Sequence, residues 1–317
     1  MDTKGVFSNK KKKRWVPKED VPLIFMALPL VILLLIFCYF PMVGVVMAFQ
    51  KLDIAKGVFT SPWVGLKNFE FLFASTDAFR ITRNTVLYNV AYISINMVLS
   101  IAMALILSSI RSKKVSKFTQ TIYMMPYFLS WTVVAIVGQA FLNREYGLIN
   151  QTILSVTGTK SLTNWYSRPD IWPYLLVIVN AWKGVGYSSV LYLAMISGIS
   201  PDYYEAAMLD GASKLQQARY ITIPHLRFIV SISLILAVGG IMKGDFGLHF
   251  TVPSLMSNPR LIPVVDIVDT YVYRSLVGLS NLGMPAAAGL YQSAVGFVLV
   301  MVANRIVRKI DENSALF

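Results

Sequence analysis

The chain alternates long apolar runs with shorter polar segments. An apolar run of about 18 or more residues is long enough to cross the hydrocarbon core of a bilayer as a helix. The pattern therefore predicts an all-α, polytopic membrane protein with six transmembrane helices. The six runs lie at about 22–48, 85–110, 119–142, 171–197, 226–244 and 286–308.

Basic residues are densest in alternate polar segments. Residues 1–21 carry seven Lys or Arg, and residues 111–117 carry four in "RSKKVSK". The intervening segments are longer and sparser: 50–84, 143–170 and 245–285 carry five, three and two. Because short cytoplasmic loops are enriched in Lys and Arg, we expect both termini inside the cell. This arrangement predicts a basic cytoplasmic N-terminus over 1–21, a transmembrane domain over 22–317 and a cytoplasmic loop over 198–225.

Composition supports the membrane assignment. Of 317 residues, 56% are hydrophobic and only 14% are charged, whereas soluble domains carry about 25% charged residues. The net charge of +13 comes from basic residues at the ends of apolar runs, where they contact lipid headgroups, so we expect membrane lipid and no nucleic acid as a partner. A single cysteine excludes an intramolecular disulfide.

Several runs contain polar residues that lipid would not accept. The fourth holds Asn180, Trp182 and Lys183, and the third holds Trp131. A lysine near the bilayer centre costs about 3 kcal/mol, so such residues face a protein interior or water. These four residues are candidates for lining a transport path. For Lys183 an interhelical hydrogen bond is an equal alternative, and Trp side chains also serve as interfacial anchors.

One polar segment, Ser200 to Pro224, stands between two apolar runs and carries strong helix signals. Ser200, Pro201 and Asp202 make a helix start, and Gly211 is a natural end. Ser213 and Gln216 have capping-box spacing for a second helix, which should end near Pro224. Local chemistry therefore predicts two short helices joined by a sharp turn. On the first helix, one stripe consists of Tyr203, Ala206, Ala207 and Asp210.

This segment resembles the EAA loop of ABC importer permeases, whose pattern is EAA-x3-G-x9-I-x-L-P. The matching residues are Glu205, Ala206, Ala207, Gly211, Ile221 and Pro224. Ile223 stands where the family usually has Leu, a change that conserves volume. The resemblance implies the type I importer permease architecture. It also implies that the first helix is a coupling helix that docks in a groove of a separate ATPase subunit.

Weaker motifs along the chain resemble the carbohydrate-uptake branch of these permeases. "DTYVYR", residues 269–274, is similar to the group that imports oligosaccharides and complex glycans. The resemblance implies a permease in the bacterial plasma membrane with a second permease subunit, two ATPase subunits and an extracytoplasmic sugar-binding protein. Other stretches that carry the resemblance are "FPMVGVVMAFQKLD", "SPWVGLKNFEFLF", "RNTVLYNV", "GLIN" and "ANRIVRK".

The sequence gives little support for an enzyme. It contains no G-x4-G-K-[ST] loop, so we expect ATP and Mg²⁺ on the partner ATPase and no cofactor or metal on this chain. His225 and His249 are far apart, and Asp266 with Asp269 is only a weak acidic pair. The alternative function is an ion-gradient-driven secondary transporter, which would need a midplane ion site, usually with carboxylates or broken helices in inverted repeats. The sequence has no acidic residue well inside an apolar run and no evident repeat.

Overall fold

The computed structural model describes residues 21–310 apart from 54–56, 71–75, 111, 159–161 and 280–282. Over these described ranges the regular structure is helical, and the only β contact is an isolated bridge between Gln50 and Trp63. The predicted all-α class is therefore confirmed. Apart from Val21, the predicted basic N-terminus lies outside the described residues.

Three of the predicted runs form helices that are long and apolar enough to cross a membrane: 22–48, 85–110 and 286–308. The second of them starts earlier than predicted, at Thr76. The helices are a first run made of α1 (Val21–Leu34), a π turn η1 (Leu35–Tyr39) and a 3-10 segment η2 (Phe40–Phe49), then α3 (Thr76–Ser108), then α14 (Gly283–Ile310).

The third predicted run, 119–142, is not one continuous helix. It consists of α4 (Lys113–Met124), a 3-10 turn η4 (Met125–Phe128) and α5 (Trp131–Leu142), and the two helical arms meet at 97°. The break follows from local chemistry. Pro126 removes a backbone donor, Leu129 is extended with ψ 136°, and the Ser130 hydroxyl accepts the Val133 N–H at 3.3 Å to begin α5.

The fifth predicted run, 226–244, also differs from a simple rod. A helical stretch from Lys214 to His225 leads into α11 (Arg227–Gly239) with a 58° bend. The helix ends at Gly239 rather than near residue 244, and turns follow it. The stretch before the bend consists of α9 (Lys214–Gln217), a π turn η6 (Ala218–Thr222) and α10 (Ile223–His225).

The fourth predicted run forms a single helix of 26 residues, α7 (Trp172–Ser197), which packs along α3. Because it contains several polar residues, α7 is not one of the three helices that are apolar enough to cross a membrane. By length and apolarity, the described residues hold three membrane-crossing helices, or up to five if each bent pair is one span. Gly186 brings α7 against α4, because a Cβ there would lie 1.9 Å from the Tyr123 carbonyl oxygen.

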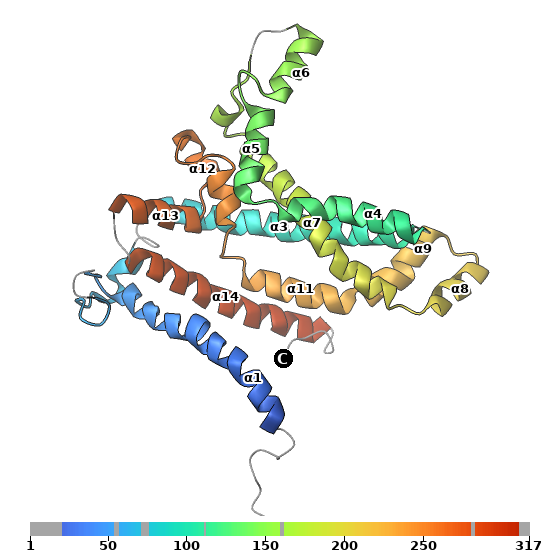
Figure 1. Cartoon of the computed structure of the whole chain (residues 1–317), viewed down its shortest axis with the longest axis horizontal. Coiled ribbons are helices and arrows are strands. Elements are labelled where there is room, and N and C mark those ends of the chain that lie inside the picture. The colour runs from blue at the N-terminus through green and yellow to red at the C-terminus, as the bar shows by residue number, and fades with distance from the viewer. Residues whose placement is uncertain are drawn as a thin grey trace, which may run out of the picture.

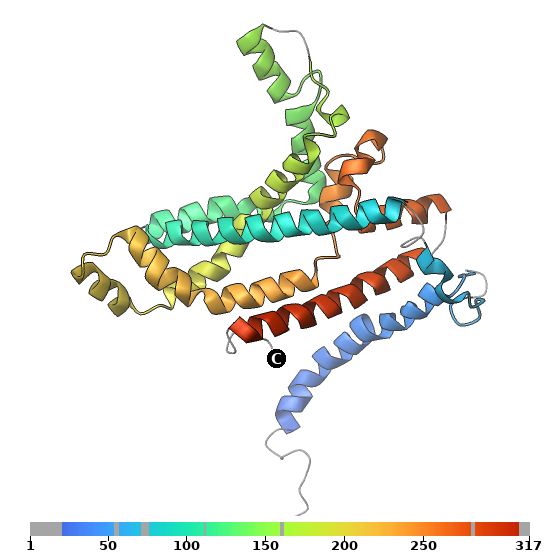
Figure 2. The same cartoon turned by 180° about the vertical axis from the view of Figure 1, so that it is seen from behind.

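The long helices lie roughly along one axis, with α8 (Pro201–Leu209) and α9 at one end and α13 (Val268–Leu279) at the other (Figures 1 and 2). A separate arm formed by α5 and α6 (Leu148–Thr157) projects away from this axis (Figure 1). The remaining described elements are η3 (Gly65–Phe69), η5 (Trp165–Ser167), η7 (Gly247–Thr251), η8 (Pro259–Leu261) and α12 (Ile262–Val265).

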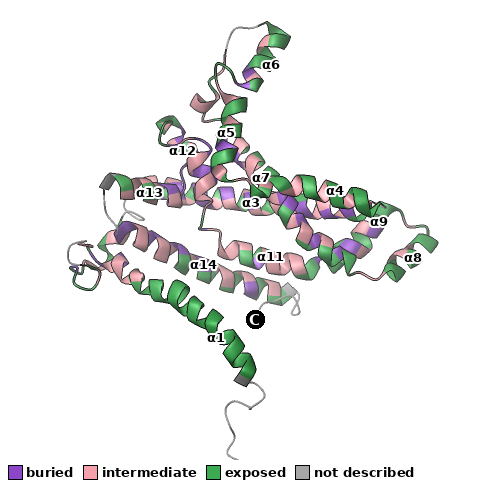
Figure 3. Cartoon of the chain, in the orientation of Figure 1, coloured by how far each residue is buried: buried purple, intermediate pink, exposed green. Residues whose placement is uncertain are grey.

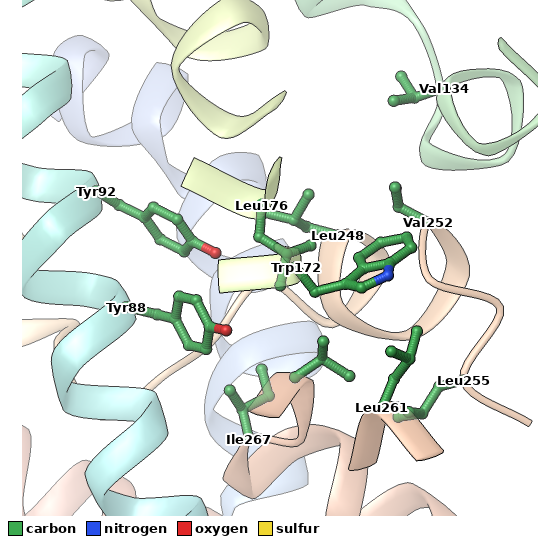
Figure 4. Packing of buried hydrophobic residues seen from close by; sticks show 11 residues of the cluster. Tyr88, Tyr92, Val134, Trp172, Leu176, Leu248, Val252, Leu255, Leu261 and Ile267 are labelled. Atoms are coloured by element: carbon green, nitrogen blue, oxygen red, sulfur yellow. The ribbon is translucent and has the colours of Figure 1, made fainter. Parts of the chain in front are cut away.

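The main hydrophobic core lies where α3 and α7 meet the segment 246–267. Tyr88 and Tyr92 of α3 point toward Leu248, and Trp172 and Leu176 of α7 complete the cluster (Figure 4). The Tyr88 hydroxyl donates to the Val264 carbonyl at 2.7 Å. In contrast, α1 is exposed on all sides (Figure 3). The largest buried cluster therefore lies between α3, α7 and the segment that bridges them.

Candidate functional site: a helical hairpin and a polar cavity

The helical hairpin, residues 200–225, begins with the predicted cap. The Asp202 N–H donates to the Ser200 hydroxyl at 3.4 Å, and Pro201 is the first residue of α8. Proline suits this position because the first helical N–H groups have no partner within the helix. The predicted start of the first short helix is confirmed.

Gly211 makes the turn of the hairpin. Its φ is +78°, a left-handed conformation that glycine adopts without steric cost. The Ala212 N–H donates to the Ala207 carbonyl at 2.8 Å, and the Gly211 N–H donates to the Met208 carbonyl at 3.1 Å. These two bonds form a Schellman motif, which satisfies carbonyls that the helix end leaves free. The turn is therefore fixed by backbone hydrogen bonds.

The second arm of the hairpin opens with the predicted capping box. The Gln216 N–H donates to the Ser213 hydroxyl at 3.4 Å, and the Ser213 N–H donates to the Gln216 side-chain oxygen at 2.7 Å. The helical stretch runs through Pro224 to His225, and the 58° bend follows. The predicted end near Pro224 is confirmed.

Two side-chain contacts join the arms of the hairpin. The Tyr204 hydroxyl lies 3.0 Å from the Thr222 hydroxyl, and the rings of Tyr203 and His225 are 5.4 Å apart. Behind α8 lies a cavity of about 440 Å³ that Glu205 lines. Six of the predicted hairpin residues are exposed, namely Tyr203, Glu205, Ala206, Asp210, Gly211 and Pro224, while Ala207 and Ile221 are half-buried.

The tip of the hairpin exposes large apolar side chains. Leu209 is 90% exposed and Leu215 is 80% exposed, on either side of the Gly211 turn. Water is a poor environment for two leucines held this far out on a rigid turn. Leu209 and Leu215 thus form a small exposed apolar surface with polar groups around it. Such a surface is suited to a complementary groove on another protein.

A second feature is a polar cavity of about 470 Å³ within the bundle. It lies between α3, α7, α11 and the turn that follows α11. Its walls carry amide, hydroxyl and charged groups rather than hydrocarbon alone, which is unusual inside an apolar bundle. The polar and charged side chains in its lining are Asn89, Tyr92, Asn96, Asn180, Ser188, Tyr192, Ser233, Lys243 and Asp245.

Hydrogen bonds hold the walls of this cavity in place. The Asn96 side chain donates to the Asn180 side-chain oxygen at 2.7 Å, which joins α3 to α7. The Asn89 side chain donates to the carbonyls of Ile241 at 3.0 Å and Lys243 at 3.2 Å. From α14, the Gln292 side chain donates to the Met242 carbonyl at 2.7 Å. The turn 240–245 is therefore fixed from two helices.

Lys183 does not line the polar cavity. Its ammonium donates to the carbonyls of Pro126 at 3.3 Å, Tyr127 at 2.7 Å and Leu129, which lie at the break between η4 and α5. It also lies 5.1 Å from the Trp131 ring centroid. Lys183 thus links α7 to the broken third run, the interhelical role that the sequence left as an alternative.

The structure does not bring the four predicted path residues to one surface. Asn180 lines the polar cavity. Trp182 lines an apolar groove between α3 and α7, about 580 Å³ in volume. Trp131 packs on Gly247, where a Cβ would lie 2.0 Å from the indole, and contacts Lys183. A role in transport remains a prediction for all four residues.

The sequence reasoning missed several cavity residues, although a signal was present. Asn89, Tyr92 and Asn96 recur at spacings of three and four residues in an otherwise apolar run, so they share one face of α3. Such a polar stripe on a long apolar helix indicates a surface that faces water or protein. No group of three or more His, Cys, Asp or Glu that could hold a metal ion occurs within the described part of the chain.

Apolar helices long enough to cross a membrane, together with a polar cavity between α3, α7 and α11, are typical of a membrane transport protein. The model of the family described as "Binding-protein-dependent transport system inner membrane component" matches residues 96–312, and the chain belongs to that family. It is therefore a multi-pass membrane component of a transport system and not an enzyme. The predicted family is confirmed.

The curated relatives include a "Polygalacturonan/rhamnogalacturonan transport system permease protein" of Bacillus subtilis (strain 168). It is 34% identical over 97% of this chain and 94% of its own length. "Protein LplB" of the same organism is 32% identical over 93% and 91%. A crystal structure of a bacterial ABC transporter that imports the acidic polysaccharide alginate matches with a TM-score of 0.81 at 30% identity, covering 93% of this chain and 97% of that chain.

Proposed function

We propose that this chain is the transmembrane permease subunit of an ATP-driven importer of oligosaccharides or complex glycans. The observation that carries the proposal is the helical hairpin 200–225, held rigid at both arms and exposed at its tip. Support for a carbohydrate comes from the relatives, whose names include polygalacturonan and rhamnogalacturonan transport, and from the related alginate transporter. The subunit would form half of the translocation path.

The hairpin would act as the coupling helix that docks on the ATPase. The proposed coupling residues are Tyr203, Glu205, Ala206, Ala207, Asp210, Gly211, Ile221 and Pro224. Caps, the Schellman motif and the contact between Tyr204 and Thr222 make the hairpin a stiff lever. Because α7 ends just before it and α11 begins just after it, a push on the lever would move both helices. A loop without these bonds would absorb the motion instead.

The partners of this subunit follow from the same proposal. A second permease subunit would complete the path as a heterodimer, and two ATPase subunits would bind ATP and Mg²⁺. An extracytoplasmic sugar-binding protein would deliver the substrate. A related alginate transporter was solved in complex with an alginate pentasaccharide-bound periplasmic protein, with a TM-score of 0.80 at 29% identity. Six spans and both termini in the cytoplasm complete the arrangement.

The polar cavity is the part of this chain best suited to a sugar. Sugar hydroxyls both donate and accept hydrogen bonds, and amide and hydroxyl side chains can do the same. Asn180 with Asn96 supplies a pair of amides, and Ser233 adds a hydroxyl. Trp131 and Trp182 lie outside this cavity but would border the path as the helices move. Lys183 would hold the broken third run in shape.

The test compares two glycine variants in the importer assembled with its partners in liposomes. Gly211 and Gly158 are both exposed glycines with positive φ, at +78° and +65°, and each follows a short helix. Gly211→Pro removes the turn of the hairpin, whereas Gly158→Pro makes the equivalent change after α6. We expect Gly211→Pro to insert normally but to lose substrate-stimulated ATP hydrolysis and uptake, and Gly158→Pro to keep both.

Normal stimulated hydrolysis in Gly211→Pro would refute the coupling role. Uptake that survives ATP depletion but stops with an ionophore would favour the ion-gradient-driven alternative.

A further inference from the structure

Lys183 lies on α7 and Lys243 on the turn that follows α11, and the structure gives them different surroundings. Lys183 directs its ammonium at three backbone carbonyls. Lys243 lines the polar cavity, and among the residues that the structure describes no carboxylate lies within ion-pair distance of it. Its side chain is exposed. Of the two, Lys243 is the one that keeps its donors available to a ligand.

The backbone beneath Lys243 is fixed, although its side chain is free. The Lys243 N–H donates to the Gly240 carbonyl at 2.8 Å, and its carbonyl accepts from the Asn89 side chain at 3.2 Å. The next residue, Gly244, packs so closely that a Cβ there would lie 2.1 Å from the Ile267 side chain. The ammonium is therefore carried on a rigid base at the cavity wall, which lowers the entropy lost when it binds a partner.

The acidic residues near Lys243 have hydrogen-bond partners of their own. Asp245 accepts the Leu248 N–H at 3.1 Å and caps the turn that follows. Asp269 accepts the Gly244 N–H at 2.8 Å and the Gln292 amide at 3.2 Å. Both carboxylates are thus occupied in holding the backbone. Their charges remain, and Asp269 also interacts electrostatically with Lys243. Neither carboxylate forms an ion pair with the Lys243 ammonium, so this ammonium is the group on the wall that can donate to an incoming carboxylate.

We propose that Lys243 is a specificity-determining residue that favours sugars carrying carboxylate groups. The proposal rests on the proposed import function and narrows its substrate class to acidic oligosaccharides. The amide and hydroxyl groups of the cavity would bind the sugar hydroxyls, and the Lys243 ammonium would bind the carboxylate by a charge-assisted hydrogen bond. The related transporter that imports the acidic polysaccharide alginate handles a cargo of this charge.

The test measures uptake of two probes that share one sugar chain, with the carboxylates free in one and methyl-esterified in the other. The probes are trigalacturonate and its fully methyl-esterified form, offered to liposomes that hold the complete importer and its binding protein. Three variants are compared with the unmodified chain: Lys243→Gln, Lys243→Arg and Lys113→Gln. The last removes one positive charge from an exposed lysine of α4, outside the cavity. Because every sample uses the same binding protein, a change in the ratio of the two uptake rates reports on the permease.

We expect Lys243→Gln to lower uptake of the free acid roughly tenfold, the loss of about one charge-assisted hydrogen bond, and to leave uptake of the ester unchanged. Lys243→Arg and Lys113→Gln should keep the original ratio. An unchanged ratio in Lys243→Gln would overturn the role of Lys243 while leaving the import function standing. Uptake of neither probe by the unmodified importer would overturn the assignment to acidic oligosaccharides, while the proposed import function would still be tested by Gly211→Pro.

Discussion

Replacing Lys183 with Met tests whether this lysine holds the break in the third run. Met preserves most of the packing volume and removes the ammonium that donates to the Pro126, Tyr127 and Leu129 carbonyls. Without it, two partly buried carbonyls lose their donor, while the Tyr127 carbonyl is exposed enough for water to replace the bond.

The magnitude follows from two opposing effects. Each hydrogen bond from a charged group is worth about 1.5–3 kcal/mol, so two such bonds contribute roughly 3–6 kcal/mol. Placing a lysine within a membrane bundle costs about 2.5–3.5 kcal/mol, and replacing Lys183 with Met removes this cost and so stabilises the protein by that amount. The net destabilisation expected for Lys183→Met is therefore about 1–3 kcal/mol. The loss of the contact with the Trp131 ring acts in the same direction.

The assay is reversible unfolding of the purified importer by sodium dodecyl sulfate in mixed micelles, followed by tryptophan fluorescence. Lys243→Met is the matched control, since it removes a lysine whose ammonium bonds none of the described carbonyls. The reasoning predicts lower stability for Lys183→Met than for Lys243→Met. If Lys183→Met were as stable as the unmodified chain or more so, the lysine would not be supporting the break.

Two further predictions concern close packing and pH. Gly186→Ala should reduce the amount of folded protein in membranes, because its Cβ would lie 1.9 Å from the Tyr123 carbonyl oxygen, whereas Gly198→Ala, with 3.4 Å to the nearest atom, should accumulate normally; equal amounts would refute the contact. His249 accepts from the Tyr92 hydroxyl at 2.9 Å and donates to the Val265 carbonyl at 2.7 Å, and burial lowers its pKa from 6.5 to about 4. The unfolded chain therefore binds the proton more readily than the folded chain. The buried, neutral His249 contributes about 3 kcal/mol to the free energy of unfolding above pH 6.5, and this contribution is lost as the pH falls toward 4. The pH dependence of unfolding should flatten over this range in His249→Gln, and an unchanged slope would contradict the assignment.

Local signals allowed the hairpin to be predicted almost residue by residue. Ser200, Gly211 and the Ser213–Gln216 pair each fix the backbone through bonds to near neighbours, so the sequence contains the whole cause. The apolar runs were also predicted correctly where the helix is continuous, as in α3 and α14. In both cases the determining interactions span only a few residues.

The breaks and the cavity depend on contacts between distant residues and were predicted less well. The sequence predicted 119–142 as one run, whereas the two arms meet at 97° and the carbonyls at the break accept hydrogen bonds from Lys183, far along the chain. Lys243 likewise lies on the cavity wall because Asn89 and Gln292 fix its turn from two other helices. The sequence places Lys183 in the middle of the fourth run and Lys243 at the end of the fifth, but it does not show which groups each ammonium meets.

The central claim is that the exposed face of α8 docks on a separate nucleotide-hydrolysing subunit. A photoreactive benzophenone residue placed at Ala206, compared with one at Thr152 of α6, which is also exposed, tests it in intact cells that express the whole importer. The account predicts an ATP-dependent cross-link to the ATPase from position 206 and none from position 152. A cross-link to the ATPase from position 152 alone, or from neither position, would contradict it.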